Sequence, residues 1–239
     1  MFAKINIFLC LLLVAGLFFA CLLGSTTLAP ATVLQALGGF GDPADLVVVW
    51  QIRLPRALTA MCVGGALGMS GAALQGLLRN PLAEPGVLGV SASAALAATV
   101  VIYYGWVQFS AMLLPLAAIA GALVATGFIA AAALASASAV TLILIGVGLS
   151  SFAAALMSLL MNFAPHPFTL ADMINWMLGS VANRSYADLQ LSLPFLVIGM
   201  VLLWVSRRGL SALSLGDEAA QGIGLNLRRQ RLLIVTGAG

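Results

Sequence analysis

Long apolar runs separated by short polar stretches dominate the sequence. A helix needs about 20 apolar residues to cross the hydrocarbon layer of a membrane, and six runs approach or exceed that length: 5–24, 56–78, 88–105, 111–135, 140–162 and 189–206. A seventh begins near Arg231 and stops with the chain at Gly239. Apolar segments of this length cannot span lipid as open strands. The pattern therefore predicts an all-α polytopic membrane protein with about six complete transmembrane helices plus the start of a seventh.

The composition supports this prediction. Of the 239 residues, 62% are hydrophobic and 7% are charged, whereas about 25% are charged in an ordinary soluble domain. The net charge of +3 arises from basic residues scattered at the ends of apolar runs, so we expect no nucleic-acid partner. Cys10, Cys21 and Cys62 lie inside such runs and His166 is the only histidine. We therefore expect no disulfide framework, metal site or other cofactor.

The distribution of basic residues predicts the orientation in the membrane. With a cytoplasmic N-terminus and an uncleaved first helix, seven basic residues face the cytoplasm and three face outward, in agreement with the positive-inside rule. The inner set is Lys4, Arg79, Arg207, Arg208, Arg228, Arg229 and Arg231. The outer set is Arg53, Arg56 and Arg184. Two arginines close together on the outer side are unusual and need an explanation.

The sequence also limits how the protein can be energised. Apart from Arg56 at the mouth of the second, the predicted spans contain no Asp, Glu, Lys, Arg or His, and such groups usually carry the ion pathway of proton-coupled carriers. The only lysine is Lys4, so the chain has no P-loop lysine with which to hold ATP. We expect no catalytic residues, and any uphill transport would draw its energy from another chain. A carrier driven by an ion gradient through backbone carbonyls remains an alternative.

Several stretches together resemble one protein family. They are "RLPR" (53–56), "SGAALQGLLRNPLAEPGVLGVS" (70–91), "LILIGVGLSSFAAALMSLLMNF" (142–163), "INWMLGSVANRSYADLQLSLPF" (174–195) and "ALSLGDEAAQGIGLNLRRQRLL" (212–233). The family is the permease subunit of bacterial ABC importers for iron–siderophore complexes, haem and cobalamin. The resemblance covers about residues 45–239. It implies transport of an iron chelate or cobalamin across the bacterial inner membrane, and it does not indicate which cargo.

The resemblance also implies partners and site residues. Arg53 and Arg56 would dock a periplasmic substrate-binding protein by pairing with its carboxylates; the alternative is headgroup anchoring, with Pro55 starting the helix. The polar segment 213–229 would couple to an ATP-binding subunit through a short amphipathic helix. Its site residues are Leu215, Gly216, Asp217, Glu218, Ala219, Ala220 and Gly224. The alternative for this segment is an interfacial helix lying on the headgroups.

A third implied site is the turn "ASASAVT" (135–141), where Ser138, Ala139, Val140 and Thr141 would form the inner gate; a simple tight hairpin is the alternative. The turn "LLRNPLAEPG" (77–86) offers Arg79 and Glu84 for a local ion pair. Residues 167–180, "PFTLADMINWMLGS", are expected to be structural, as a short outer helix or part of the bundle cap.

The resemblance places 1–239 in one permease domain that would pair with a second permease chain, identical or different. Members of the family usually continue through ten helices, so we expect this sequence to be C-terminally incomplete. The remaining alternative from another class is a membrane fragment or scaffold that does not transport.

Overall fold

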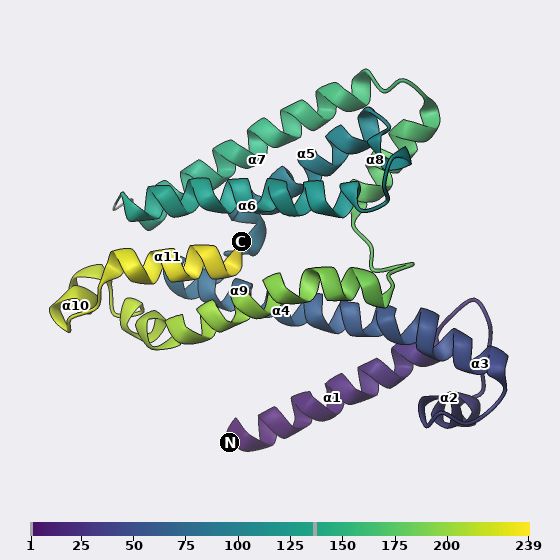
Figure 1. Cartoon of the computed structure of the whole chain (residues 1–239). Helices are drawn as coiled ribbons and strands as arrows, with labels where there is room; N and C mark the ends of the chain where they lie inside the picture. Colours follow the sequence, from purple (N-terminus) through teal and green to yellow (C-terminus); the bar gives the residue numbers. More distant parts are fainter. Residues whose placement is uncertain (1, 136–137) are drawn as a thin grey trace. The chain divides into compact units, whose positions relative to one another are not determined.

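A computed structural model describes residues 2–135 and 138–239, and every regular element among them is helical. Figure 1 shows these elements along the chain. The bounds of the α-helices are α1 Phe2–Leu22, α2 Pro30–Leu37, α3 Pro43–Val47, α4 Leu54–Leu78, α5 Val90–Tyr103, α6 Leu113–Leu134, α7 Ala139–Asn162, α8 Pro167–Leu178, α9 Tyr186–Leu213, α10 Asp217–Gly222 and α11 Leu227–Ala238. A π-helical turn, η1 Val48–Arg53, joins α3 to α4, and two 3₁₀ turns, η2 Pro85–Leu88 and η3 Trp106–Gln108, flank α5.

Among the described residues, five helical stretches are long and apolar enough to cross a membrane: Ala3–Leu22, Pro43–Leu78, Leu113–Leu134, Ala139–Asn162 and Tyr186–Leu213. They correspond to five of the six complete spans that the sequence predicts. The prediction of an all-α membrane protein is therefore confirmed.

The third predicted span, 88–105, is shorter than expected. Its helix α5 has 14 residues, which rise about 21 Å, less than the hydrocarbon thickness of about 30 Å. The segment Pro85–Leu88 forms a separate 3₁₀ turn, and Gly89 has a φ of 73°. That left-handed residue separates the 3₁₀ turn from α5, so the turn and the helix do not form one continuous span.

The second span begins earlier than the sequence suggested. Pro55 does not start the helix, because the helical stretch runs without a break from Pro43 to Leu78. Pro43 occupies the first turn, where its missing N–H costs nothing, and the Asp42 side chain accepts a bond from the Ala44 N–H at 3.0 Å. The π-helical turn Val48–Arg53 lies immediately before Pro55.

Side-chain caps begin several of the other helices. Ser138 Oγ accepts from Thr141 N at 3.1 Å at the start of α7, and Asn226 Oδ1 accepts from Arg229 N at 3.0 Å at the start of α11. Before α9, Ser185 N donates to the Asp188 carboxylate at 2.8 Å and Asp188 N donates back to Ser185 Oγ at 3.4 Å. This reciprocal pair satisfies two amides that the helix leaves without intrahelical partners.

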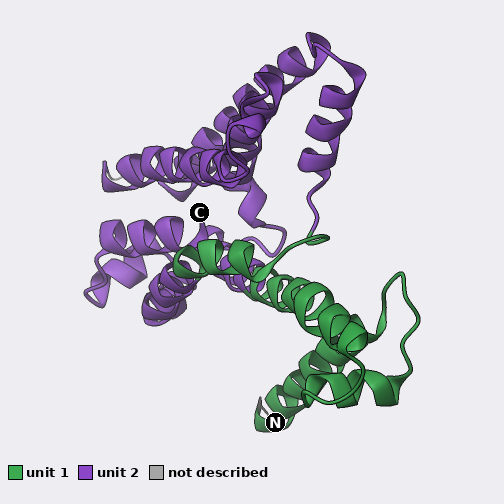
Figure 2. Cartoon of the chain, turned by 45° about the vertical axis from the view of Figure 1, so that its right-hand side comes forward, with its two compact units in different colours: residues 1–65, 181–196 green, residues 66–180, 197–239 purple. Residues whose placement is uncertain are grey.

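The chain forms two compact units, coloured separately in Figure 2. Unit 1 comprises Met1–Gly65 and Val181–Leu196, and unit 2 comprises Ala66–Ser180 and Val197–Gly239. In unit 1 a small apolar core of Cys21, Val33, Ala36, Val49 and Ala57 joins α1 to the helices that follow it.

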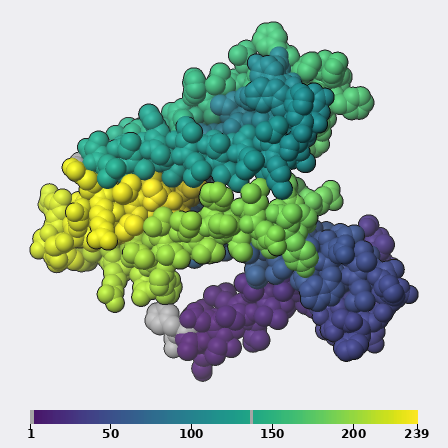
Figure 3. Space-filling model, in the orientation of Figure 1, coloured from purple at the N-terminus to yellow at the C-terminus, as the bar shows by residue number. Residues whose placement is uncertain are grey.

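Unit 2 has the larger core. Its fully buried side chains include Leu74, Ile129, Leu142, Leu213 and Ile234, which come from five different helices. In Figure 3 the surface of α11 (yellow) meets that of α6 (teal), and these helices pack against each other.

Glycines allow helix backbones within unit 2 to approach closely. A Cβ on Gly146 would lie 2.1 Å from the Val87 carbonyl oxygen, and one on Gly121 would lie 2.6 Å from that of Ser93. The small-residue stretches in the sequence therefore include true contact points between elements, as expected for helices packed in lipid.

Candidate functional site

The polar segment after α9 folds as the sequence predicts, into a short helix between two glycines. Gly216 and Gly224 have φ values of 105° and 88°, which other residues rarely adopt, and they bracket α10, Asp217–Gly222. Ala220 is fully buried, and its N–H donates to the Gly216 carbonyl at 2.9 Å. Leu225 N then donates to the Ala220 carbonyl at 3.0 Å. The glycines thus set the direction of the chain, and Ala220 fixes the segment in the core of unit 2.

The remaining surface of this segment is open. Leu215 is 69% exposed and Ile223 is 67% exposed, and the side chains of Glu218 and Ala219 between them are exposed as well. Two large apolar side chains are therefore exposed on either side of a helix that begins with two acids.

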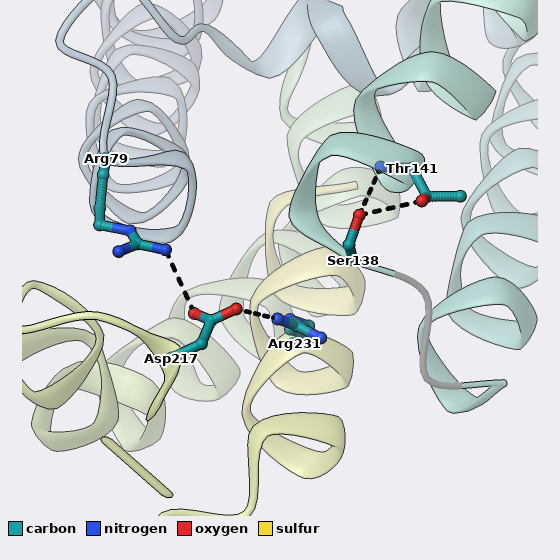
Figure 4. Close-up of polar contacts among 5 residues, drawn as sticks. All are labelled: Arg79, Ser138, Thr141, Asp217 and Arg231. Carbon is teal, nitrogen blue, oxygen red and sulfur yellow. Dashed lines mark hydrogen bonds and ion pairs between the residues drawn. The ribbon is translucent and has the colours of Figure 1, made fainter. Parts of the chain in front are cut away.

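Asp217 lies at the start of α10 and contacts two arginines from distant parts of unit 2 (Figure 4). Its Oδ2 accepts from Arg231 Nη2 at 2.6 Å, and its Oδ1 accepts from Arg79 Nη2 at 3.4 Å. Arg79 comes from the end of α4 and Arg231 from α11. The local pair of Arg79 with Glu84 is not among the ion pairs of the described residues.

A second polar contact, which the sequence did not indicate, joins α9 to α11. Gln230 is 6% exposed and donates through Nε2 to the carbonyl of Ser206 at 2.6 Å. Gly209 leaves room for this side chain, because a Cβ there would lie 2.2 Å from the Gln230 amide and would displace it. In the sequence, Gln230 is one polar residue within the arginine-rich start of α11, which does not distinguish it from its neighbours.

The proposed gate residues lie at the start of α7. Ser138 caps the helix, and its Oγ lies 2.9 Å from Thr141 Oγ1 (Figure 4). Ala139 and Val140 form the first turn of α7. Residues 136 and 137 of the same turn lie outside the described residues.

Arg53 has a different environment from the one expected of a docking residue. It is 2% exposed, and its Nη1 donates to the carbonyls of Cys21 and Leu22, each at 2.8 Å. Its Nη2 donates to the carbonyl of Thr26 and, at 3.0 Å, to Thr26 Oγ1. A Cβ on Gly24 would lie 2.9 Å from this guanidinium group. Arg53 therefore caps the C-terminus of α1, where the helix leaves carbonyl groups without intrahelical partners.

Arg56 lies nearer the surface of the same unit. It is partly exposed, and its Nη2 donates to the carbonyls of Leu23 at 2.8 Å and Ala20 at 3.2 Å. Both arginines thus contact the end of α1. Arg53 is enclosed there, while Arg56 remains partly open to solvent.

Among residues 2–135 and 138–239, no group of three His, Cys, Asp or Glu side chains gathers to hold a metal ion. The described residues combine long apolar helices with two polar features. One is α10, whose Asp217 contacts two arginines. The other is the end of α1, which Arg53 and Arg56 cap. Together, the five long apolar helices among the described residues define a multi-pass membrane protein with a helical permease fold.

The comparisons with known proteins show the family to which the chain belongs. A model of the FecCD transport family matches residues 11–239, and the chain belongs to this family. A solved structure described as a "metal-chelate type ABC transporter" in an inward-facing conformation superimposes with a TM-score of 0.81 at 33% sequence identity. That match covers 99% of this chain and 73% of the solved chain. The resemblance seen in the sequence is therefore confirmed.

Two curated relatives are similar over nearly the whole chain. The iron(3+)-hydroxamate import system permease protein FhuG of Bacillus subtilis is 33% identical over 95% of this chain and 70% of its own length. The vitamin B12 import system permease protein BtuC of Salmonella paratyphi A is 37% identical over 96% of this chain and 67% of its own length. The chain spans between 57% and 70% of the lengths of these and other curated permeases that it matches.

Proposed function

We propose that this chain is the transmembrane permease subunit of a binding-protein-dependent ABC importer that takes up an iron chelate, either a siderophore complex or haem, or cobalamin. The observation that carries the proposal is its membership of the FecCD transport family, with relatives named for hydroxamate and vitamin B12 import. The chain itself is not an enzyme, and ATP hydrolysis belongs to a separate ATP-binding subunit.

The proposed contact with that subunit is α10 and the residues beside it. Leu215 and Ile223 expose their side chains on either side of the helix, while Ala220 holds it in the core. A short helix that is fixed on one face and open on the other suits the transfer of motion between two proteins. The proposed coupling residues are Leu215, Gly216, Asp217, Glu218, Ala219, Ala220 and Gly224.

On the opposite side of the membrane, we assign binding-protein docking to the end of α1 that Arg53 and Arg56 contact. Arg53 would have to leave several carbonyl groups before it could pair with a partner's carboxylate. Arg56 has fewer bonds to give up and is partly exposed. We therefore propose that Arg56 makes the direct contact and that Arg53 holds the surface in shape.

The remaining features follow from the same function. The protein lies in the bacterial inner membrane with its N-terminus in the cytoplasm, because this orientation puts most basic residues inside. A second permease chain completes the pathway, and residues Ser138–Thr141 lie at its inner gate. Alternating exposure of the pathway to the two sides of the membrane would follow ATP-driven closure of the partner subunits.

Deletion of this chain in its own host tests the proposal. Uptake of radiolabelled ferric hydroxamate, haem and cobalamin is measured in a strain that lacks other importers for the same cargo. Uptake of one of the three should be lost, and it should return when the full-length chain is supplied from a plasmid. Unchanged uptake of all three would contradict the proposed cargo class.

A further inference from the structure

The ion pairs of Asp217 differ in strength in a way that bears on how α10 moves. The carboxylate uses a separate oxygen for each arginine (Figure 4). The contact with Arg231 is 2.6 Å, and the Arg231 side chain is 8% exposed. The contact with Arg79 is 3.4 Å, and that side chain is 50% exposed.

The contact with Arg231, which is partly buried, is the stronger of the two. A guanidinium that is removed from water needs a nearby negative charge, and loss of that charge destabilises the folded state strongly. Asp217 supplies the charge for Arg231 and is itself 37% exposed. Because Asp217 belongs to α10 and Arg231 to α11, the pair ties the first residue of the polar helix to the next membrane segment.

Apolar packing holds α10 at one residue and does not extend along the whole helix. An open pocket of about 330 Å³ lies where α10 meets the start of α11, lined by Gln221, Leu225, Asn226, Leu227, Arg228 and Arg231. Ala220 is the residue of α10 that is fully buried. The helix is therefore held at Ala220 and at Asp217, with space beside it.

The contact between Asp217 and Arg79, by contrast, is long and exposed to solvent. An exposed ion pair at this distance changes an equilibrium constant by about fivefold at most. Arg79 also sits in a left-handed conformation with a φ of 50°, at the point where the chain leaves α4. The loop that follows it is held separately, since Gln75 Nε2 donates to the Pro81 carbonyl at 3.0 Å and Asn80 Oδ1 accepts from Leu82 N at 2.9 Å. Opening the contact would leave that loop in place.

From this difference we infer that Asp217 is a positioning residue with two separate tasks. Its bond to Arg231 keeps α10 joined to α11 in every state of the transport cycle. Its bond to Arg79 is a releasable contact with the end of α4, which opens and closes as α10 moves. The inference rests on the proposed coupling role of α10, and it adds the path by which movement of α10 reaches the membrane helices.

Amide hydrogen exchange of residues 217–225 in the purified full-length protein tests the tie itself, without any partner. Asp217→Asn keeps the size of the side chain and removes its charge, and it should speed exchange of this segment by about tenfold or more. Asp217→Glu, which retains a carboxylate, should stay closer to wild type. Arg79→Gln should change exchange by no more than about fivefold. Glu84→Gln is the matched control, because Glu84 is an exposed acid near Arg79 in sequence, and it should have no effect.

Two outcomes would overturn the inference. Wild-type exchange in Asp217→Asn would show that the carboxylate does not hold α10. An effect of Arg79→Gln as large as that of Asp217→Asn would show that the two contacts are not different in kind. Cargo taken up per ATP hydrolysed, measured in the assembled importer, then separates this inference from the proposed function. If Asp217→Asn speeds exchange but leaves the cargo taken up per ATP unchanged, the bond between Asp217 and Arg231 does hold α10. The coupling role proposed for α10 would then be contradicted.

Discussion

Replacement of Arg53 by methionine tests whether this arginine holds the end of α1. Methionine keeps an apolar chain about as long as the aliphatic stem of arginine and removes every guanidinium donor. The carbonyls of Cys21, Leu22 and Thr26 then lose a charged partner. Cys21 is 1% exposed, so water cannot readily replace the arginine at its carbonyl.

The expected cost follows from these contacts. A buried acceptor left without a partner costs about 1–3 kcal/mol, and loss of a cation at a helix C-terminus costs about 0.3–1 kcal/mol, or up to about 2 in a buried site. Water can reach the carbonyls of Leu22 and Thr26, which lie nearer the surface, so they add little. We expect Arg53→Met to lower the free energy of unfolding by about 3 kcal/mol in total.

Arg56→Met is the matched control. Its two hydrogen bonds go to carbonyls of Ala20 and Leu23 in a less buried site, and their loss should cost about 0.5–1.5 kcal/mol. Thermal unfolding of both variants in the same detergent measures the difference. A loss of about 3 kcal/mol corresponds to a Tm lower by roughly 6–12 °C for a chain of this size. Equal Tm values for Arg53→Met and wild type would refute the capping role and leave Arg53 available for a partner.

Three further predictions follow from individual contacts. Gly146→Ala should lower the free energy of unfolding by about 1–3 kcal/mol in a thermal scan, because its Cβ would meet the Val87 carbonyl oxygen at 2.1 Å. Gly148→Ala is the control and should be neutral in the same scan, because a Cβ there would have nothing within 4 Å. Ala220→Pro removes the N–H that bonds to the Gly216 carbonyl, so it should abolish stimulation of the ATPase by the binding protein while membrane insertion stays normal; retained stimulation would count against α10 as the coupling element. Arg56→Glu should weaken binding of the periplasmic partner, and more so at low salt, because like charges then face each other; wild-type affinity at two salt concentrations would end the docking assignment.

The broad fold could be predicted from the sequence because apolar length alone decides whether a segment can span lipid. The short helix between Gly216 and Gly224 was also predictable, since turn glycines and acids in a first helical turn are local signals. At the second span one local signal was outweighed by another. Pro55 suggested a helix start, but the cap at Asp42 and Pro43 begins the helix earlier.

For the charged residues, distant segments decide the outcome. Sequence spacing offered Glu84 as a partner for Arg79, whereas the structure gives it Asp217, 138 residues away. The resemblance implied that Arg53 docks a binding protein, which would need an accessible guanidinium, whereas the Arg53 side chain is 2% exposed. It is buried because the end of α1 presents carbonyl groups that need donors, and nothing near Arg53 in the sequence indicates that helix end. Predicted topology does place Arg79, Asp217 and Arg231 on one side of the membrane, which is the one available signal for their meeting.

Uptake into membrane vesicles tests the central claim most directly. Vesicles that contain the full-length chain with its ATP-binding subunit are loaded with ATP, and the labelled cargo is added outside with its binding protein. If the chain is an ABC importer permease, vanadate should abolish uptake, and an ionophore that collapses ion gradients should leave it intact. Uptake that survives vanadate and is lost with the ionophore would contradict the account and identify a carrier driven by an ion gradient.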